Sequence, residues 1–341
     1  MKKFAKVLGT FALAGAMLAG CGSSDSGASQ SGSNDGGDKA ADATKDAKIG
    51  IIQYAEHPAL DASKKGFEEY LKEKGYSNFD YKNAQGDQIN CTNIAQTFVN
   101  DGDELIYAIA TPAAQAVANE TKDIPIVVSA VTDPKTSGLV DENEKPGTNV
   151  TGASDLNPVT EQIALLKQLL PDAKKVAIMY CNAEDNSRYQ ADLAKKECEK
   201  LGLETVDATV TDSNQIQQVT ESLIGKVDAI YIPTDNLLAE GMTAVTQVAN
   251  ENGLPTIVGE EGMVANGGLA TYGIDYYELG RMAGEQAVKI LEEGADPKDM
   301  AIVYLPGDKC TLSINQNTVD KLGIEIPADL KDRAEFVTEE E

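Results

Sequence analysis

Two short polar turns hold residues that are suited to bind the charged groups of a small ligand. Thr111-Pro112 follows an apolar run over 105–110, and threonine is a good helix N-cap while proline suits the first helical position. The free backbone amides of that first turn, which includes Ala113, form an anion site with the Thr111 hydroxyl. We therefore predict that a ligand carboxylate binds here. A second interpretation is that Thr111 only caps its helix.

The equivalent turn in the second half of the chain carries the opposite charge. Thr234, Asp235 and Asn236 follow an apolar run over 229–233. The Asp235 carboxylate is predicted to accept the ammonium group of a zwitterionic ligand, with Asp275 as a second candidate. The alternative is that Asp235 only caps the helix that begins at Asn236.

Further candidates follow the other predicted strands at the positions where each strand ends. Tyr54 is the best partner for a ligand ring, and Tyr180, Tyr231, Tyr272, Tyr276 and Tyr277 are alternatives. Glu260 faces either the cleft or water, and asparagines in such turns often serve only the turn itself. The remaining predicted contacts are Gln53, Ser129, Ala130, Thr132, Asn182, Asn186 and Ser187.

The chain lacks the residues that catalysis or metal binding would need. Its one histidine, His57, precedes Pro58 and is expected to order its loop, so a metal centre or a Ser-His-Asp hydrolase would depend on that residue alone. GxSxG, HExxH, GxGxxG and phosphate-loop patterns do not occur. We predict a non-enzymatic protein without metal or cofactor, and any ATP hydrolysis is assigned to a partner.

These turns belong to a duplicated pattern of alternating strands and helices. A segment that opens at Lys48 and closes at Gly75 is matched by one that opens at Lys175 and closes at Gly202. Alternation of this kind predicts an α/β fold with parallel sheets joined by helical crossovers. Strands are predicted over 49–53, 79–83, 105–110, 126–129, 176–180, 204–210, 229–233 and 256–259, and helices over 62–74, 158–170 and 190–200.

Two similar lobes with a cleft between them follow from the duplication, because ligands bind beyond the carboxyl ends of parallel strands. After the second lobe we predict an element over 269–274, a helix through 291, a strand near 301–305 and a strand-helix tail from 311. These additional elements indicate that the chain crosses between the lobes more than once, near 152–157, 271–275 and 305–309. The N-terminal lobe is predicted to comprise 48–154 plus 273–305, and the C-terminal lobe 155–272 plus 306–341.

The N-terminus has the pattern of an export signal. Three lysines precede an uncharged apolar run, which is too short to span a membrane and ends in Leu-Ala-Gly before Cys21. This segment resembles the lipobox of bacterial lipoproteins, which implies cleavage after residue 20, a diacylglyceryl group on Cys21 and anchoring at the extracytoplasmic face of the cell membrane. The alternative is a plain secreted protein. Residues 21–47 are rich in Ser, Gly and Asp and predict a flexible tether.

The net charge and the cysteines of the chain disfavour some classes of partner and site. The formal net charge is −26, which disfavours nucleic acid and anionic lipid headgroups as partners. Besides Cys21, the cysteines are Cys91, Cys181, Cys198 and Cys310. They show no CxxC or His/Cys cluster, and we favour buried thiols over disulfides.

Several sequence blocks together resemble one family. They include Glu56-His57-Pro58-Ala59-Leu60-Asp61, Ala110-Thr111-Pro112-Ala113-Ala114-Gln115, Ala130-Val131-Thr132-Asp133-Pro134 and Gly273-Ile274-Asp275-Tyr276-Tyr277. The chain is similar to the substrate-binding lipoproteins of ABC importers for tryptophan or tyrosine, which have a type I periplasmic-binding fold. The resemblance implies a three-segment hinge, an aromatic amino acid ligand, and a permease with its ATPase as partners. Other interpretations are a surface adhesin that binds a host surface, and a sugar or purine receptor of the same fold.

Overall fold

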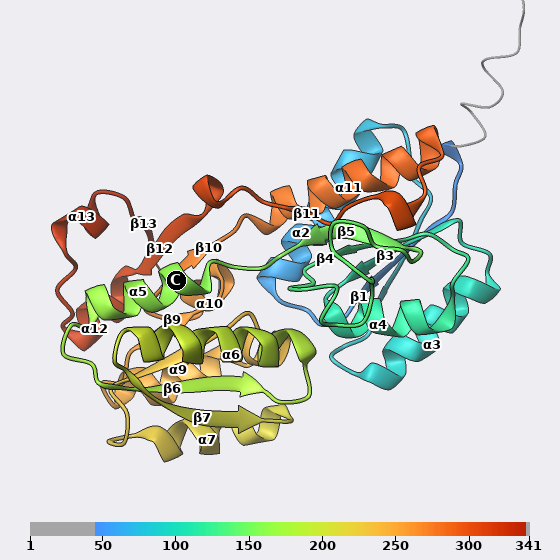
Figure 1. Ribbon diagram of the computed structural model, residues 1–341. Coiled ribbons are helices and arrows are strands. Elements are labelled where there is room, and N and C mark those ends of the chain that lie inside the picture. Colours follow the sequence, from blue (N-terminus) through green and yellow to red (C-terminus); the bar gives the residue numbers. More distant parts are fainter. Residues whose placement is uncertain (1–44, 339–341) are drawn as a thin grey trace, which may run out of the picture. The chain divides into compact units, whose positions relative to one another are not determined.

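The computed structural model describes residues 45–338, apart from the side chain of Asp308. The predicted signal, Cys21 and most of the predicted tether lie outside these residues. Two separate sheets, each flanked by helices, make up one compact unit (Figure 1). The predicted α/β architecture is confirmed. Within the described residues, no helix combines the length and apolar character that crossing a membrane requires.

The first sheet has six parallel strands in the order β11-β5-β4-β3-β1-β2. We call this sheet and its helices the N-terminal lobe. Its strands are β1 Ile49–Gln53, β2 Phe79–Asn83, β3 Leu105–Ile109, β4 Ile126–Ser129, β5 Val150–Ser154 and β11 Val303–Tyr304. Its helices are α2 Pro58–Glu73, α3 Gln88–Asn100, α4 Thr111–Glu120 and α11 Tyr276–Glu293, with a 3₁₀ turn at Pro297–Asp299.

The second sheet has seven strands in the order β13-β12-β10-β9-β8-β6-β7, and we call it with its helices the C-terminal lobe. Its strands are β6 Lys175–Cys181, β7 Glu204–Val210, β8 Ala229–Ile232, β9 Thr256–Val258, β10 Ala270–Gly273, β12 Thr311–Asn315 and β13 Glu335–Val337. Its helices are α5 Val159–Leu169, α6 Asp185–Lys200, α7 Ile216–Leu223, α8 Asn236–Glu240, α9 Met242–Glu251, α10 Glu261–Ala265, α12 Gln316–Leu322 and α13 Ala328–Lys331. Two 3₁₀ turns span Ser213–Gln215 and Gly307–Lys309.

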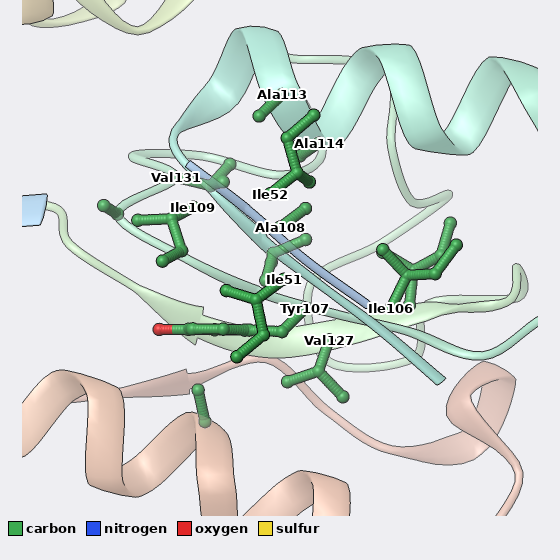
Figure 2. Close-up of a cluster of buried hydrophobic side chains, with 14 of the residues drawn as sticks. Ile51, Ile52, Ile106, Tyr107, Ala108, Ile109, Ala113, Ala114, Val127 and Val131 are labelled. Carbon is green, nitrogen blue, oxygen red and sulfur yellow. The ribbon is translucent and has the colours of Figure 1, made fainter. Parts of the chain in front are cut away.

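The core of the N-terminal lobe is built on both faces of its sheet. β1 and β3 are buried along their whole length, as expected for near-continuous apolar runs in a parallel sheet. In Figure 2, Ile52 and Ala108 lie on the side of α4, whereas Tyr107 points to the other side. On that second side the Tyr107 ring stacks on Phe67 of α2, with the ring centroids 3.7 Å apart. Successive residues of β3 point to opposite faces of the sheet, so α4 and α2 pack on opposite faces.

The chain passes between the sheets three times, at 155–158, 274–275 and 305–310. One consequence differs from the expected all-parallel sheets, because β12 runs antiparallel to β10. After β10 the chain enters α11, which packs in the other lobe, so β12 does not arrive through a helical crossover on its own sheet. Its first residue, Thr311, pairs with Gly273 at the end of β10, and the two strands therefore run in opposite directions.

Two strands were not predicted. β5, Val-Thr-Gly-Ala-Ser, lies where a crossing segment was expected, and its small and polar residues give a weak strand signal. It is nonetheless fully buried between β4 and β11. β13 is a three-residue strand at the edge of the second sheet, which is too short for a recognisable pattern.

Helices α2 and α11 pack side by side through glycines (Figure 1). A Cβ at Gly66 would lie 2.0 Å from the carbonyl oxygen of Tyr277, and one at Gly280 would lie 1.9 Å from that of Ser63. Glycine within a helix costs about 1 kcal/mol relative to alanine. The close backbone approach explains why glycine occupies both positions.

We expect Gly66→Ala and Gly280→Ala each to lower the free energy of unfolding by about 2 kcal/mol, because overpacking outweighs the gain in helix propensity. Gly284→Ala is the control, since the nearest atom to its added Cβ is the mobile side chain of Tyr70 at 2.9 Å. Urea denaturation measures all three. Equal stability of the three variants would contradict the proposed backbone contact.

Candidate functional site

A cavity lies between the two lobes at the carboxyl ends of strands from both sheets. It encloses about 20 Å³, which is room for about one water molecule. An amino acid needs far more space, so it can enter only if the lobes move apart. The lining residues are His57, Leu60, Ala130, Asp155 and Tyr276 from the N-terminal lobe and its first crossing, and Asn186, Thr234, Asp235, Asn236, Ala239 and Glu260 from the C-terminal lobe.

Two of the lining carboxyl groups come from segments that follow β5 and β9. Asp155 Oδ2 accepts a hydrogen bond from the Tyr276 hydroxyl at 2.9 Å, while Oδ1 has no partner among the described residues. Glu260 accepts from the backbone amides of Gly262 at 2.6 Å and Met263 at 2.9 Å. Burial raises the pKa of Asp155 to about 6 and that of Glu260 to about 7.

A second pair of carboxyl groups surrounds the start of α8. Asp235 accepts from the amides of Cys181 at 2.5 Å and Leu238 at 2.9 Å, so it caps α8 and braces β6. Glu184 accepts from the Leu237 amide at 3.2 Å and the Asn186 side chain at 3.1 Å. Burial, together with the nearby Asp235 charge, raises the pKa of Glu184, and burial raises the pKa of Asp235.

No lysine or arginine is among the described residues that line the cavity. His57 adds no positive charge, because burial lowers its pKa below the usual value. The cavity therefore collects negative charge in a poorly hydrated space. A bound cation would give these carboxylates an interaction in place of the hydration that they lose on burial.

Side-chain hydrogen bonds connect the lobes around the cavity. His57 Nε2 lies 3.3 Å from Asn236 Oδ1, and Gln190 Nε2 donates to Thr132 Oγ1 at 3.1 Å. On α4, Gln115 Nε2 donates to Asp185 Oδ2 at 2.7 Å. These bonds form only when the lobes approach each other, so this is a closed arrangement.

The first turn of α4 keeps its amides free of side-chain caps. Ala110, at the N-cap, has φ 81° and ψ 152°, a conformation that residues other than glycine rarely adopt. The first intrahelical bond runs from Ala114 to Ala110, which leaves the amides of Thr111 and Ala113 without a helical partner. The buried Thr111 Oγ1 also has no partner among the described residues. Ala130, after β4, has φ 52°. Backbone strain of this kind concentrates at ligand sites.

Of the ligand contacts predicted from the sequence, six line the cavity: Ala130, Asn186, Thr234, Asp235, Asn236 and Glu260. Tyr276, one of the alternative ring partners, lines it as well. Asn186 and Ser187 lie in the first turn of α6, which begins at Asp185, five residues earlier than expected. The buried Ser187 Oγ accepts from Asn186 Nδ2 at 3.2 Å, whereas Asn182 is exposed.

Other predicted residues have internal partners. Ser129 forms a buried hydroxyl cluster with Tyr107 and Ser63, 2.8 Å from the latter. Gln53 Nε2 donates to Ala55 O at 2.8 Å and to Asp61 Oδ1 at 2.7 Å. The Tyr54 hydroxyl donates to the Gly86 carbonyl at 2.9 Å.

Asp275 lies away from the cavity. It caps α11 by accepting from Tyr277 N at 2.9 Å and borders an outer groove with Glu261.

Sequence reasoning missed Asp155, Leu60 and Ala239 as lining residues and gave His57 only a structural role. For Asp155 a signal existed, because a carboxylate in a predicted crossing segment must lie near the cleft. Leu60 and Ala239 lie on the buried faces of helices. There, an apolar residue that faces the core cannot be told from one that faces the cleft by sequence.

The described cysteines form no disulfide-bonded or metal-binding cluster. Cys91, Cys181 and Cys198 are buried free thiols, and Cys310 is half-buried. Residues 45–338 contain no group of three or more His, Cys, Asp or Glu side chains placed to hold a metal ion.

Comparison with known proteins identifies relatives along nearly the whole chain. The sequence model of the family described as "ABC transporter substrate binding protein" matches residues 48–338. A tyrosine-binding protein of Clostridioides difficile is 43% identical over 329 residues, which are 95% of this chain and 93% of that protein.

Two solved structures bear on the arrangement of the lobes. An ABC domain from Streptococcus pneumonia in complex with L-Trp is 38% identical and has a TM-score of 0.82, covering 85% of this chain and 100% of that chain. A ligand-free, open substrate-binding protein with adhesive properties from Clostridium difficile is 42% identical, but its TM-score is 0.66 over 86% and 100% of the two chains. This chain thus resembles the ligand complex more in shape although the open protein is more similar in sequence, which agrees with a closed arrangement.

The buried carboxyl groups predict how the stability of the ligand-free protein depends on pH. The folded-state pKa of Asp155, about 6, lies above its ordinary value of 3.8, so the stability that its protonation supplies is present at low pH and is lost as pH rises through about 6. We expect Asp155→Asn to lose less stability than the wild type between about pH 4 and pH 7 in thermal denaturation. The exposed Asp172 supplies the control. Asp172→Asn changes the net charge equally and should follow the wild-type slope, and an identical slope in both variants would refute the assignment.

Proposed function

Because this chain belongs to the family of ABC transporter substrate-binding proteins, we propose that it captures an aromatic L-amino acid, tyrosine or tryptophan, between its lobes and delivers it to an ABC permease coupled to an ATPase. The observation that carries the proposal is the closed, acidic cavity without lysine or arginine. The tyrosine-binding and L-Trp-bound relatives support the choice of ligand class. In this role the chain itself catalyses no reaction.

The ligand ammonium is assigned to the cavity carboxylates. Asp155 has an oxygen without a hydrogen-bond partner among the described residues, whereas both oxygens of Asp235 accept from backbone amides. We therefore propose that Asp155, together with Asp235, accepts the ligand ammonium. Glu260 adds a third carboxyl group nearby. A buried ammonium stabilises the site only where such counter-charges surround it.

The ligand carboxylate is assigned to the first turn of α4. The uncapped amides of Thr111 and Ala113 and the buried Thr111 hydroxyl supply donors, and the helix dipole favours an anion there. Tyr54 remains the proposed ring partner, with Tyr276 as the alternative that lines the cavity.

Capture requires motion, because the closed cavity is too small for the ligand. The three segments that connect the sheets are the proposed hinge, and the interlobe hydrogen bonds of His57, Gln190 and Gln115 form on closure. These few polar contacts are exchangeable with water, which keeps the opened state accessible.

A lipid anchor at Cys21 on the extracytoplasmic face of the cell membrane is proposed from the sequence alone. Adhesion to a host surface is a second candidate function. It is favoured by one observation, the 42% identity to a substrate-binding protein with adhesive properties.

Calorimetric titration with the twenty amino acids should find tyrosine or tryptophan as ligand. A ligand at a hundredfold excess over its Kd should stabilise the protein by about 2.7 kcal/mol.

Asp155→Asn should weaken binding about 30-fold or more, because the buried ammonium loses a charged partner.

Asp235→Asn is the paired variant. Removal of its cap and brace should lower the melting temperature of the ligand-free protein by more than Asp155→Asn does. A larger affinity loss in Asp235→Asn at unchanged stability would instead assign the ammonium to Asp235. A sugar or nucleobase that binds while every aromatic amino acid fails would overturn the proposed function.

Cys21→Ser should release the protein from the membrane fraction or leave its signal uncleaved, because the acyl chains have no other attachment site in the proposal. Cell fractionation with mass analysis tests this. Retention of the variant in the membrane at wild-type mass would exclude the anchor.

A further inference from the structure

The orientation of the Asn236 side chain is fixed by Glu184. The Glu184 carboxylate accepts from the Asn236 backbone amide at 3.3 Å and also from the Asn236 side-chain Nδ2. A carboxylate surrounded by donors selects the NH₂ end of the amide, so the Oδ1 end must face the other way. Asn236 Oδ1 therefore faces His57 Nε2, 3.3 Å away across the interface between the lobes.

This contact determines which nitrogen of His57 carries the proton. An amide oxygen only accepts, so Nε2 must carry the hydrogen that His57 donates. Burial keeps the ring neutral by lowering its pKa. Nδ1 is consequently an acceptor with a free lone pair, and it is buried without a hydrogen-bond partner among the described residues.

His57 Nδ1 does not cap a helix, which is the common role of a polar side chain at such a position. His57 is the N-cap residue of α2, yet its side chain makes no capping bond to that helix. The side chain is 7% exposed and lines the cavity. An unpaired buried acceptor is costly, so this position in the cavity calls for a donor.

We propose that His57 Nδ1 accepts a hydrogen bond from the ring of the bound amino acid, the phenol O–H of tyrosine or the indole N–H of tryptophan, and that it thereby selects these ligands over phenylalanine. This inference rests on the proposed function. It adds His57 Nδ1 as the group that recognises the polar atom of the ligand ring.

The ring donor suits His57 better than the ammonium does. The cavity already offers Asp155, Asp235 and Glu260 as charged acceptors, and an ammonium binds a carboxylate more strongly than a neutral imidazole. A neutral acceptor matches a neutral donor. A site of this kind rejects an analogue that lacks the donor, because the acceptor then stays buried and unpaired.

His57 is the only histidine in the chain, so ¹⁵N NMR reads it without a variant. We expect the Nε2–H tautomer in the ligand-free protein and a shift of the Nδ1 resonance on addition of tyrosine, with no such shift on addition of phenylalanine. A proton on Nδ1 in the ligand-free protein would overturn the proposal, as would equal shifts with both ligands.

A matched pair of variants separates the two nitrogens in calorimetric titrations. His57→Gln places a donor near Nε2 and removes the Nδ1 acceptor, whereas His57→Asn places an acceptor near Nδ1 and removes the contact with Asn236. The wild type should bind tyrosine about 10-fold or more tightly than phenylalanine, as expected for one buried hydrogen bond. The Gln variant should lose this preference. The Asn variant should weaken both ligands equally and keep it.

The results distinguish this inference from the proposed function. A wild type that binds tyrosine and phenylalanine equally, or a Gln variant that keeps the preference, overturns the role of His57 and leaves the aromatic ligand intact. A wild type that binds no aromatic amino acid overturns both. Thermal denaturation of each variant shows whether it is folded, and the NMR experiment decides the question if either variant is not.

Discussion

Burial of carboxyl groups without a compensating cation is the constraint around which this molecule is organised. Closure removes Asp155, Asp235 and Glu260 from water, and a buried charge without a partner is costly. Backbone amides offset part of this cost for Asp235 and Glu260. In the proposed function the ligand ammonium offsets the remaining deficit, so binding favours the closed state over the open one.

The proposed hinge motion requires that the strained turns and the charged groups keep their positions within each lobe. Ala110 and Ala130 hold unfavourable backbone conformations at the ends of two fully buried strands. Next to Ala130, the hydroxyl cluster of Ser129, Tyr107 and Ser63 connects the end of β4 to α2. Packing within the lobe thus supports the strained turn, so a ligand meets preformed donors and does not have to order them.

Much of this architecture could be predicted from the sequence because it depends on local patterns. Apolar runs gave the buried strands, and the duplicated spacing gave two sheets with turns at their carboxyl ends. Side-chain direction was not accessible in the same way. Ser129 is one residue from the cleft-lining Ala130, yet its side chain points into the core, since successive residues of a strand face opposite sides. Asp155 lies in a predicted crossing segment, which indicated a position near the cleft, but whether its side chain lines the cavity depends on contacts between residues far apart in the chain.

In the proposed function the two duplicated turns present opposite charges to the ligand. At the start of α4 the amides of the first turn have no side-chain cap, so the positive end of the helix is available to an anion. At the equivalent start of α8, Glu184 and Asp235 accept from the amides of Asn236, Leu237 and Leu238. The two helix starts thus differ in charge, because the first turn of α4 has no side-chain cap whereas two carboxyl groups cover the first turn of α8. In the proposed function these turns bind opposite charges, and a zwitterion is the small molecule whose charges match them.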